Sequence, residues 1–416
     1  MERDRVTIVG AGLAGLSAAS YLKRNGFTVS LLEASDRIGG ILATDHVDGF
    51  TLDHGFQVVL DSYPEFRRLL DRSRLSLKRF DKGVDFIDSN MERHSFFDPR
   101  SNRNPRALKS MLRQFHPRDL LAIARLGSKT LFGDPKLAFE MLPETSLSYL
   151  HKNKLSAESI ERFFKPFFGA VLLDDSLETQ ARMMVFSLAN FLQGTPCIPE
   201  AGMGEIPSQI AESIPRDSIR LGTRVTRFCD VSVETDHGDV LDHDYLILAT
   251  KSDDLATLTG DETKDFGYRA VANHYYASQS DLRQSATIMI PSFVGSGVAS
   301  LAVMDAVSKS YAPPGTHLIS ISSLDATSSA EDHQATVASM LGIATKDLSP
   351  VASYRIDRAL PKVFGSGHQG EPYFMAHSQR VFLAGDFMEN PSIDGAIASG
   401  RKAAEAVMFA SSRFGE

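Results

Sequence analysis

The sequence predicts an α/β fold in which a Rossmann-like parallel domain is interleaved with a second, α+β domain. A β-branched run at residues 6–9 leads into a glycine-rich turn and then into a helix-like stretch at residues 16–24. A second strand-like run, at residues 380–384, precedes the last helix-like stretch. Between these ends, β-like runs follow a long stretch with helical spacing. Because 416 residues exceed what one compact core usually holds, we expect two domains.

The composition is that of a globular protein without a strong electrostatic bias. Hydrophobic residues make up 43% and charged residues 23% of the chain. The net charge of -8 argues against nucleic acid as a partner. Only Cys197 and Cys229 occur, and they form no CxxC motif, so neither a disulfide framework nor a cysteine zinc site is indicated. We expect a cytoplasmic protein without a conventional membrane-spanning helix.

The N-terminal glycines have the spacing of a dinucleotide-binding βαβ unit. Gly10 permits a tight turn, Gly12 lets the backbone approach a pyrophosphate, and Gly15 allows helix and strand to pack closely. The N–H groups at the start of the following helix then face the phosphates. The residues expected to contact a cofactor here are Gly10, Gly12, Leu13, Ala14 and Gly15.

Glu33 completes this unit, because it stands at the end of the second predicted strand, 18 residues beyond Gly15. A carboxylate in this place accepts hydrogen bonds from a ribose 2′-OH and disfavours a 2′-phosphate, and therefore NADP. An ordinary glycine-rich turn is the alternative explanation. The strand, helix and acid together favour a dinucleotide site, but they do not choose between FAD and NAD.

Two following segments carry a family resemblance. Residues 33–40, Glu-Ala-Ser-Asp-Arg-Ile-Gly-Gly, and residues 51–57, Thr-Leu-Asp-His-Gly-Phe-Gln, resemble the flavin amine oxidase superfamily, which includes monoamine oxidases, protoporphyrinogen oxidases and plant-type phytoene and other carotenoid desaturases. The resemblance implies a Rossmann-like FAD-binding domain of the GR2 type. FAD is expected to be non-covalent, since both cysteines precede the C-terminal part that carries the family's cysteinyl link. The implied cofactor contacts are Ala34, Arg37, Gly39, Gly40, Gly55, Phe56 and Gln57.

The C-terminal end carries the second half of the resemblance. There, Asp386 is expected to bind a ribityl hydroxyl, and the first turn of the last helix is expected to point its N–H groups at the flavin pyrimidine, where negative charge accumulates on reduction. A helix capped by Ser392 or Asp394 is the alternative explanation. The implied contacts are Gly385, Asp386, Ser392, Ile393, Asp394 and Ala396, joined by Val225 and Thr250 from two intervening strands.

The predicted domains are each assembled from separate segments. The helical subdomain spans about 98–195, where residues such as Leu108 and Met111 recur at helical spacing, and the β-like runs of the second domain suggest an antiparallel sheet. The FAD-binding domain comprises residues 1–62, 198–258 and 362–416, and the substrate-binding domain comprises residues 63–197 and 259–361.

The resemblance implies an FAD-dependent oxidoreductase that takes a hydride from an apolar small molecule onto flavin N5 and is reoxidised by oxygen or a quinone. Ser392 occupies the position of a cage Tyr in monoamine oxidases, and the chain has no Trp, so a desaturase-like dehydrogenase is favoured. A flavin amine oxidase and a non-redox FAD protein of the same fold are the alternatives. No catalytic base and no metal site is identified. The candidates for the substrate cavity are His54, Tyr354, Arg355 and Lys362, each of which could instead be structural.

One segment is strongly basic: residues 100–136 contain nine Lys or Arg against two Asp. A solvated helical face explains this excess in the simplest way. Peripheral contact with an anionic membrane, which would admit an apolar substrate, is the alternative. The sequence does not indicate an oligomeric state.

Overall fold

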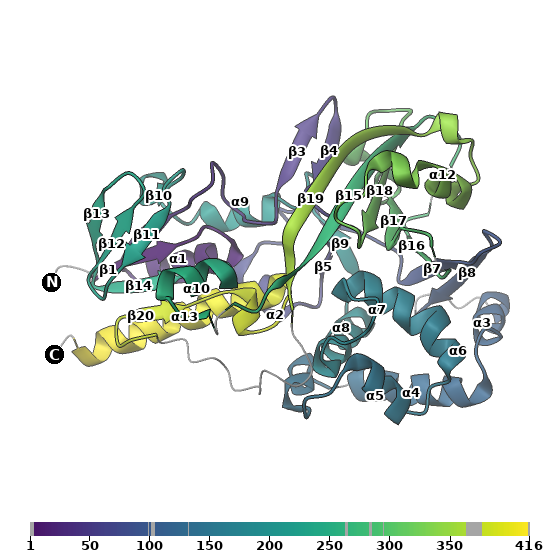
Figure 1. The fold of residues 1–416 in the computed structure, drawn as a ribbon, viewed down its shortest axis with the longest axis horizontal. Helices are drawn as coiled ribbons and strands as arrows, with labels where there is room; N and C mark the ends of the chain where they lie inside the picture. The colour runs from purple at the N-terminus through teal and green to yellow at the C-terminus, as the bar shows by residue number, and fades with distance from the viewer. Residues whose placement is uncertain are drawn as a thin grey trace.

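The computed structural model describes residues 4–98, 100, 105–131, 133–262, 265–282, 285–293, 295–362 and 377–414. Both ends of the chain lie at one end of the molecule, beside a parallel sheet (Figure 1). A long antiparallel ribbon leads from there to a second sheet, and a group of helices lies below that sheet in this view. Each of the two sheets is therefore built from strands that are far apart in the sequence, whereas the group of helices comes from one stretch, residues 105–193.

The parallel sheet has the strand order β10-β2-β1-β14-β20, and each neighbouring pair is parallel. Its inner strands are runs of buried aliphatic residues, as expected for strands covered on both faces. The strands are β10 (Ile219–Arg220), β2 (Thr28–Leu32), β1 (Arg5–Val9), β14 (Tyr245–Leu248) and β20 (Val381–Leu383). They come from three separate parts of the chain. This places both ends of the resemblance at one sheet edge.

Helices α1 (Leu13–Arg24) and α13 (Ile393–Phe414) pack against each other beside this sheet (Figure 1). Their backbones come unusually close at one point, since a Cβ added to Gly400 would lie 2.1 Å from the Ala14 carbonyl oxygen. The N-termini of two helices from opposite ends of the chain therefore belong to one structural unit.

The second sheet has the order β19-β15-β18-β17-β16-β7-β8. The prediction of an antiparallel sheet holds for every pair except β16 with β7, which are parallel. A parallel pair needs a long connection, and about 200 residues separate these two strands. The strands are β19 (Ser349–Pro361), β15 (Tyr268–Ser278), β18 (His317–Ser323), β17 (Ser300–Val303), β16 (Ile288–Pro291), β7 (Gly83–Ile87) and β8 (Arg93–Phe97). Helix α12 (Ala330–Leu341) contacts β19.

The helical subdomain has its own core, in which Leu150, Phe164, Phe168 and Leu172 are buried. Segment 165–173 contributes its buried residues to this helix packing. The elements are α3 (Pro105–Leu112), α4 (Pro117–Leu131), η1 (Pro135–Glu140), α5 (Ser146–Lys152), α6 (Ala157–Ser159), the π-helical turn η2 (Ile160–Phe164), α7 (Lys165–Leu172) and α8 (Ala181–Gln193).

Smaller elements connect the parallel domain and the second sheet through a hydrophobic core that contains Leu16 of α1 as well as Tyr275 and Tyr311 of the second domain. They include the hairpin β3 (Thr44–Val47) and β4 (Phe50–Asp53), the sheet of β5 (Val59–Leu60), β9 (Pro196–Ile198) and β6 (Lys78–Arg79), the sheet of β11 (Val225–Phe228), β12 (Ser232–Thr235) and β13 (Val240–Asp242), and the helices α2 (Pro64–Leu69), α9 (Glu205–Ala211) and α10 (Ser252–Thr259). Among the residues described, no helix combines the length and apolarity needed to cross a bilayer.

Candidate cofactor and active site

The turn between β1 and α1 has the shape that the glycine spacing predicts. Gly10 has φ +101°, and a Cβ there would lie 2.5 Å from the Ala249 carbonyl oxygen. A Cβ at Gly15 would lie 1.9 Å from the Gly10 carbonyl oxygen. A Cβ at Gly12, by contrast, would meet nothing within 4 Å. Tight packing behind the turn and open space in front of it form a cradle that fits a pyrophosphate.

The first turn of α1 is prepared for an anion. Gly12 is the N-cap, no side chain caps the helix, and no acidic residue lies in its first turn. The N–H groups of Leu13 and Ala14 therefore have no competing side-chain acceptor at this helix end, whose partial positive charge attracts phosphate.

Gly39 and Gly40 lie alongside this turn. The Gly39 N–H donates to the Ala11 carbonyl oxygen at 2.8 Å, and Gly39 forms a parallel bridge with Gly12. A Cβ at Gly40 would lie 3.4 Å from the Gly12 Cα. The structure thus brings both glycine segments to the same side of the cradle.

Glu33 lies at the end of β2 and is partly buried. Its carboxylate accepts hydrogen bonds from the Ala11 N–H at 2.7 Å, the Ser35 N–H at 2.9 Å and the Ser35 hydroxyl at 2.8 Å. A carboxylate has about four acceptor positions, so one remains for a ribose hydroxyl. Ala34 connects Glu33 to Ser35 and follows the same turn.

Val225 is the first residue of β11, and Thr250 follows the end of β14. Val225 is buried in the same cluster as Val9 and Leu32, at the carboxyl ends of β1 and β2. The backbone nitrogen of Thr250 would lie 3.5 Å from a Cβ at Gly10. Both residues therefore stand at the edge of the sheet where the glycine turn lies.

Gly385 and Asp386 follow β20 directly, and they join the start of α13 to the sheet. The Gly385 N–H donates to the Ser399 hydroxyl of α13 at 3.0 Å. The Asp386 carboxylate accepts the Phe387 N–H at 3.0 Å. Burial raises the pKa of Asp386, and the nearby Lys251 partly offsets this rise. Its remaining acceptor capacity suits a ribityl hydroxyl.

The start of α13 corrects one expectation. The Ser392 hydroxyl accepts the Gly395 N–H at 3.0 Å, and its carbonyl oxygen accepts the Ala396 N–H at 3.0 Å. Ala396 therefore does not offer a free N–H to a flavin, because Ser392 caps the helix. The Ile393 and Asp394 N–H groups make no hydrogen bond within the described part of the chain. Any backbone contact to the cofactor here falls to these two residues.

The segment after β4 contains an unsatisfied polar atom. Gly55 has φ +94°, and a Cβ there would lie 3.6 Å from Ile356 Cδ1 on β19. Gln57 donates its amide to the His54 carbonyl oxygen at 3.0 Å, but its buried Oε1 has no partner among the described residues. A buried orphan acceptor fits a donor on a bound ligand. Phe56 packs edge-to-face against Phe80, with ring centroids 6.0 Å apart.

His54 and Tyr354 meet in a clasp with Arg37 and Asp45. The guanidinium of Arg37 can only donate hydrogen bonds, so His54 Nδ1, which lies 3.1 Å from it, is the acceptor. The ring proton of His54 is therefore on Nε2, which donates it to the Asp45 carboxylate at 2.8 Å. Tyr354 donates its hydroxyl to Asp45 at 2.9 Å and stacks on the His54 ring at 4.1 Å. Both nitrogens of His54 are engaged, which favours the structural role. The clasp links β19, which carries Tyr354, to β3, which carries Asp45, and to Arg37 and His54.

Asp45 was missed by sequence reasoning, and no local pattern marks it. Burial acts to raise its pKa, but the hydrogen bonds from His54 and Tyr354 outweigh that effect, and the pKa lies below its usual value. Asp45 is therefore the charged centre of the clasp.

Arg355 and Lys362 do not join this group. Successive side chains of a strand point to opposite faces, so Arg355 faces away from Tyr354. It is exposed and pairs with Asp357 at 2.6 Å. Lys362 lies at the far end of β19, where its N–H donates to the Gly267 carbonyl oxygen at 3.0 Å. Arg355 and Lys362 therefore lie apart from His54 and Tyr354.

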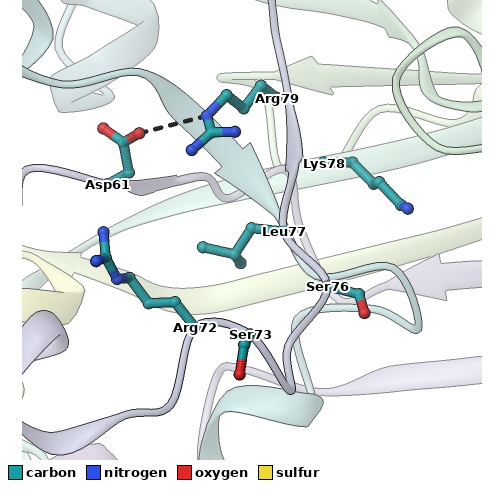
Figure 2. A pocket seen from close by; sticks show the side chains of 7 residues that line it. All are labelled: Asp61, Arg72, Ser73, Ser76, Leu77, Lys78 and Arg79. Atoms are coloured by element: carbon teal, nitrogen blue, oxygen red, sulfur yellow. Dashed lines mark hydrogen bonds and ion pairs between the residues drawn. The ribbon is translucent and has the colours of Figure 1, made fainter.

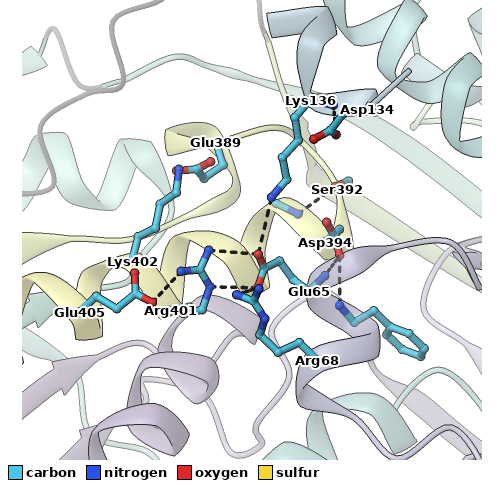
Figure 3. A network of polar contacts seen from close by, with 12 residues as sticks. Glu65, Arg68, Asp134, Lys136, Glu389, Ser392, Asp394, Arg401, Lys402 and Glu405 are labelled. Carbon is cyan, nitrogen blue, oxygen red and sulfur yellow. Dashed lines mark hydrogen bonds and ion pairs between the residues drawn. The ribbon is translucent and has the colours of Figure 1, made fainter. Parts of the chain in front are cut away.

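A buried ionic network surrounds the first turns of α13 (Figure 3). Glu65 of α2 is 1% exposed and accepts two hydrogen bonds from Arg401, at 2.9 and 3.0 Å. Asp394 is 2% exposed and accepts the Glu65 and Phe66 N–H groups at 2.8 and 3.1 Å. Lys136 of the helical subdomain approaches Glu65 to 3.7 Å. Asp394 thus caps α2 from α13 instead of capping its own helix.

Sequence reasoning missed Glu65 and Arg401. Burial acts to raise the pKa of Glu65, but Arg401 outweighs that effect and the pKa is lowered. Asp394, Arg401 and Glu405 recur at intervals of seven and four residues, which places them on one helix face. That spacing was the one available signal, and it says nothing of Glu65, which is 336 residues from Arg401.

Two cavities lie outside the cradle. One, of about 440 Å³, lies beside β6, where the side chains of Asp61, Arg72 and Arg79 surround Leu77 (Figure 2). The other, of about 460 Å³, lies between β7 and the helical subdomain and is walled in part by Phe163. Neither is lined by a residue expected to bind FAD.

Three side chains at the β7–β8 hairpin, Asp88, Glu92 and His94, have the composition of a metal site. Asp88 already accepts His94 Nε2 at 3.0 Å and the Asn90 and Glu92 N–H groups at 2.9 Å. These contacts are those of a hairpin turn, and we assign them no metal.

A comparison with known proteins identifies the family of this chain. The family described as flavin containing amine oxidoreductase matches residues 13–408. Protoporphyrinogen oxidase 2 of Arabidopsis thaliana is 30% identical over 174 residues, covering 41% of this chain and 30% of the relative. Putrescine oxidase of Kocuria rosea is 39% identical over 98 residues, covering 23% and 20%. Carotenoid 3,4-desaturase of Haloarcula japonica is 52% identical over 55 residues, covering 13% and 11%. The matched segments span less than a third of each relative.

Solved structures share the fold over the whole chain. A putative protoporphyrinogen oxidase from Exiguobacterium sp. 255-15 aligns with a TM-score of 0.73 at 19% identity, covering 98% of this chain and 99% of that chain. An oxidoreductase from Methanosarcina mazei aligns with a TM-score of 0.76 at 16% identity, covering 96% and 100%. The cradle fits FAD, and the family match extends over most of the sequence. This chain belongs to the family of flavin-containing amine oxidoreductases and is an FAD-dependent oxidoreductase.

Proposed function

We propose that the protein is a desaturase-like dehydrogenase, which removes a hydride from a C–H group of an apolar small molecule and passes the electrons to oxygen or a quinone. When bound, FAD supplies the hydride acceptor at its N5. The observation that carries the proposal is Ser392. At the position where an amine-guiding aromatic residue stands in monoamine oxidases, Ser392 presents a hydroxyl that caps α13 through the Gly395 N–H.

The carboxylates around the cradle support the same substrate class. A cationic amine is stabilised by an unpaired carboxylate, but Asp45, Asp53 and Glu65 already bind protein donors. Asp53, for example, accepts hydrogen bonds from Tyr311 at 2.9 Å and Thr44 at 2.6 Å. These three carboxylates are therefore already paired and offer no free charge to a cationic amine.

A row of aromatic rings also leads from β7 into the helical subdomain. Phe163 contacts Phe86 of β7 at 4.9 Å between ring centroids and Phe167 at 6.4 Å. Phe167 in turn contacts Phe191 of α8 at 5.5 Å. This row of rings offers an extended apolar substrate favourable contact area.

An amine oxidase is the second candidate, and the similarity to putrescine oxidase favours it. A non-redox FAD protein is the third, because a UDP-galactopyranose mutase aligns with a TM-score of 0.71 at 15% identity. Anaerobic mixing of the FAD-loaded protein with polyenes, porphyrinogens and amines distinguishes the three by bleaching of the flavin absorbance. We expect bleaching by a polyene or a porphyrinogen. Bleaching by amines alone would reverse the order of the first two candidates.

We also propose that the basic segment 100–136 makes peripheral contact with an anionic membrane. Within its described residues, Leu121 is 66% exposed and lies on α4 among exposed Arg118 and Arg125. An exposed leucine flanked by arginines suits the headgroup region of a bilayer. Residues 101–104 and 132 lie outside the described residues. We expect the protein to float with phosphatidylserine vesicles and to lose this binding at high salt and in the double variant Arg118→Gln/Arg125→Gln. Equal flotation with neutral vesicles would contradict the charge argument.

A further inference from the structure

Asp394 combines three properties that rarely coincide. It is the second residue of α13, at the helix end expected to contact the flavin, and it is 2% exposed. Its carboxylate serves as the cap of another helix through the N–H groups of Glu65 and Phe66. Its own N–H makes no hydrogen bond to any described residue. A negative charge therefore lies buried at the helix end whose partial positive charge the cofactor would use.

The groups packed around Asp394 do not neutralise it. From α2 it faces the buried hydroxyl of Tyr63 and the carboxylate of Glu65, and from the helical subdomain it faces Lys136 (Figure 3). Arg401 on its own helix is engaged by Glu65 and Glu405. Burial, followed by the neighbouring Glu65, raises the pKa of Asp394 to about 6, while the two N–H groups and Lys136 limit that rise.

We propose that Asp394 is a positioning residue that binds a solvent proton when the bound FAD is reduced, and thereby sets the reduction potential and its pH dependence. The inference rests on the expected contact between the first turn of α13 and the flavin. It does not depend on the substrate class proposed above, because any two-electron donor tests it.

The charges and protons of this step balance. If FAD is bound, a hydride taken from a substrate C–H would bring two electrons and one proton to it and make it one unit more negative, while a substrate that gains a double bond would release its second hydrogen to solvent as a proton. One proton from water then converts the Asp394 carboxylate to a carboxyl group. The site returns to its original net charge, and the two hydrogen bonds to α2 remain, because a protonated carboxyl still accepts through one oxygen.

The expected coupling is large enough to measure. At an effective dielectric constant of about 20, two unit charges about 12 Å apart change each other's proton affinity about tenfold. One α-helical turn rises about 5.4 Å, so a carboxylate in the first turn lies within that range of a group bound at the helix end. A tenfold effect corresponds to about 30 mV for a two-electron couple.

The test is the midpoint potential of the FAD-loaded protein, measured from pH 5 to pH 8 in wild type, Asp394→Asn and Glu405→Gln. The asparagine keeps an oxygen acceptor for α2 but cannot ionise. We expect the wild-type potential to fall more steeply with pH between about pH 6 and pH 7, by about 15 mV per pH unit, than that of Asp394→Asn. Glu405→Gln, which changes an exposed carboxylate of the same helix, is expected to match wild type.

The result that would overturn the proposal is an identical pH slope in wild type and Asp394→Asn. Should the variant fail to fold, proton uptake by the wild type decides: photoreduction in weak buffer with a pH indicator is expected to take up about half a proton more per flavin at pH 6.5 than at pH 8. Equal proton uptake at the two pH values would also overturn the proposal. Failure of polyenes to reduce the flavin would leave this measurement unaffected, since it concerns only the proposed substrate.

Discussion

Two helix N-termini are expected to contact the cofactor, and they are built in opposite ways. Helix α1 begins at a glycine, has no side-chain cap and carries no acid in its first turn. Helix α13 begins after Ser392, which binds two of its N–H groups, and it carries a buried Asp394. The first is an unmodified positive helix end, suited to a permanent anion such as a pyrophosphate. The second is a partly neutralised end, suited to a group whose charge changes during the reaction.

The difference indicates that a helix dipole is not used alone where the charge of the ligand varies. At α1, the charge of the phosphates is constant, so glycine backbone geometry is sufficient. At α13, the added carboxylate makes the local potential depend on a proton. Substitutions at four positions test this contrast, beginning with the most damaging.

Substitution of Gly15 by Ala is expected to abolish the folded, FAD-loaded state. The new Cβ would lie 1.9 Å from a backbone oxygen, which cannot move without displacing β1. Gly12→Ala is the matched control, because its Cβ meets nothing within 4 Å. We expect Gly12→Ala to keep the thermal stability of the FAD-free protein but to weaken FAD binding at least about tenfold. A normally loaded Gly15→Ala protein would contradict the tight cradle.

Arg401→Met is expected to destabilise the protein by about 3–5 kcal/mol, because it leaves Glu65 buried without its ion-pair partner. Urea unfolding, followed by circular dichroism, measures this effect. The double variant Glu65→Leu/Arg401→Met is expected to recover much of the loss, because both charges are then absent. A single variant as stable as wild type would show that α13 is not held by this pair.

The stability of Asp394→Asn relative to wild type is expected to depend on pH. The pKa of Asp394 is about 6 in the folded protein, whereas that of an unperturbed aspartate carboxyl is 3.8, so the folded state binds the proton more tightly. The resulting stability is present below about pH 4 and is lost as the pH rises to about 6, by about 3 kcal/mol at most. Asp394→Asn lacks this loss, so its free energy of unfolding should rise relative to that of wild type between about pH 4 and about pH 6. Parallel curves from urea unfolding at several pH values would refute the raised pKa.

Ser392→Ala is expected to have the smallest effect, a loss of about 1 kcal/mol, because it removes one N-cap hydrogen bond from a long helix. Ser392→Thr retains the hydroxyl and serves as the control. If the freed Gly395 N–H then turns to the cofactor, FAD binding should strengthen while protein stability falls. Unchanged melting temperatures in both variants would mean that the cap contributes little.

The cofactor half of the site was largely accessible to sequence reasoning, and the substrate half was not. Gly10, Gly12 and Gly15 act through backbone geometry within one turn, so their spacing alone predicts the cradle. His54 was predicted as a candidate for the substrate cavity, but its contacts depend on Asp45 and Tyr354, which reach it from two other strands. Periodicity cannot report such contacts, because they depend on how the sheets are arranged.

Sequence alone was sufficient to predict the α/β class, the glycine cradle, the acid after β2 and the family, because each depends on residues that are neighbours in the chain or that share a fixed spacing. The tertiary structure decided which charges are buried and what they touch: Glu65 meets Arg401 across 336 residues, and Asp394 caps a helix other than its own. The physical reason is that burial and ion pairing depend on the packing of whole elements, whereas turns and helix ends depend on local backbone geometry.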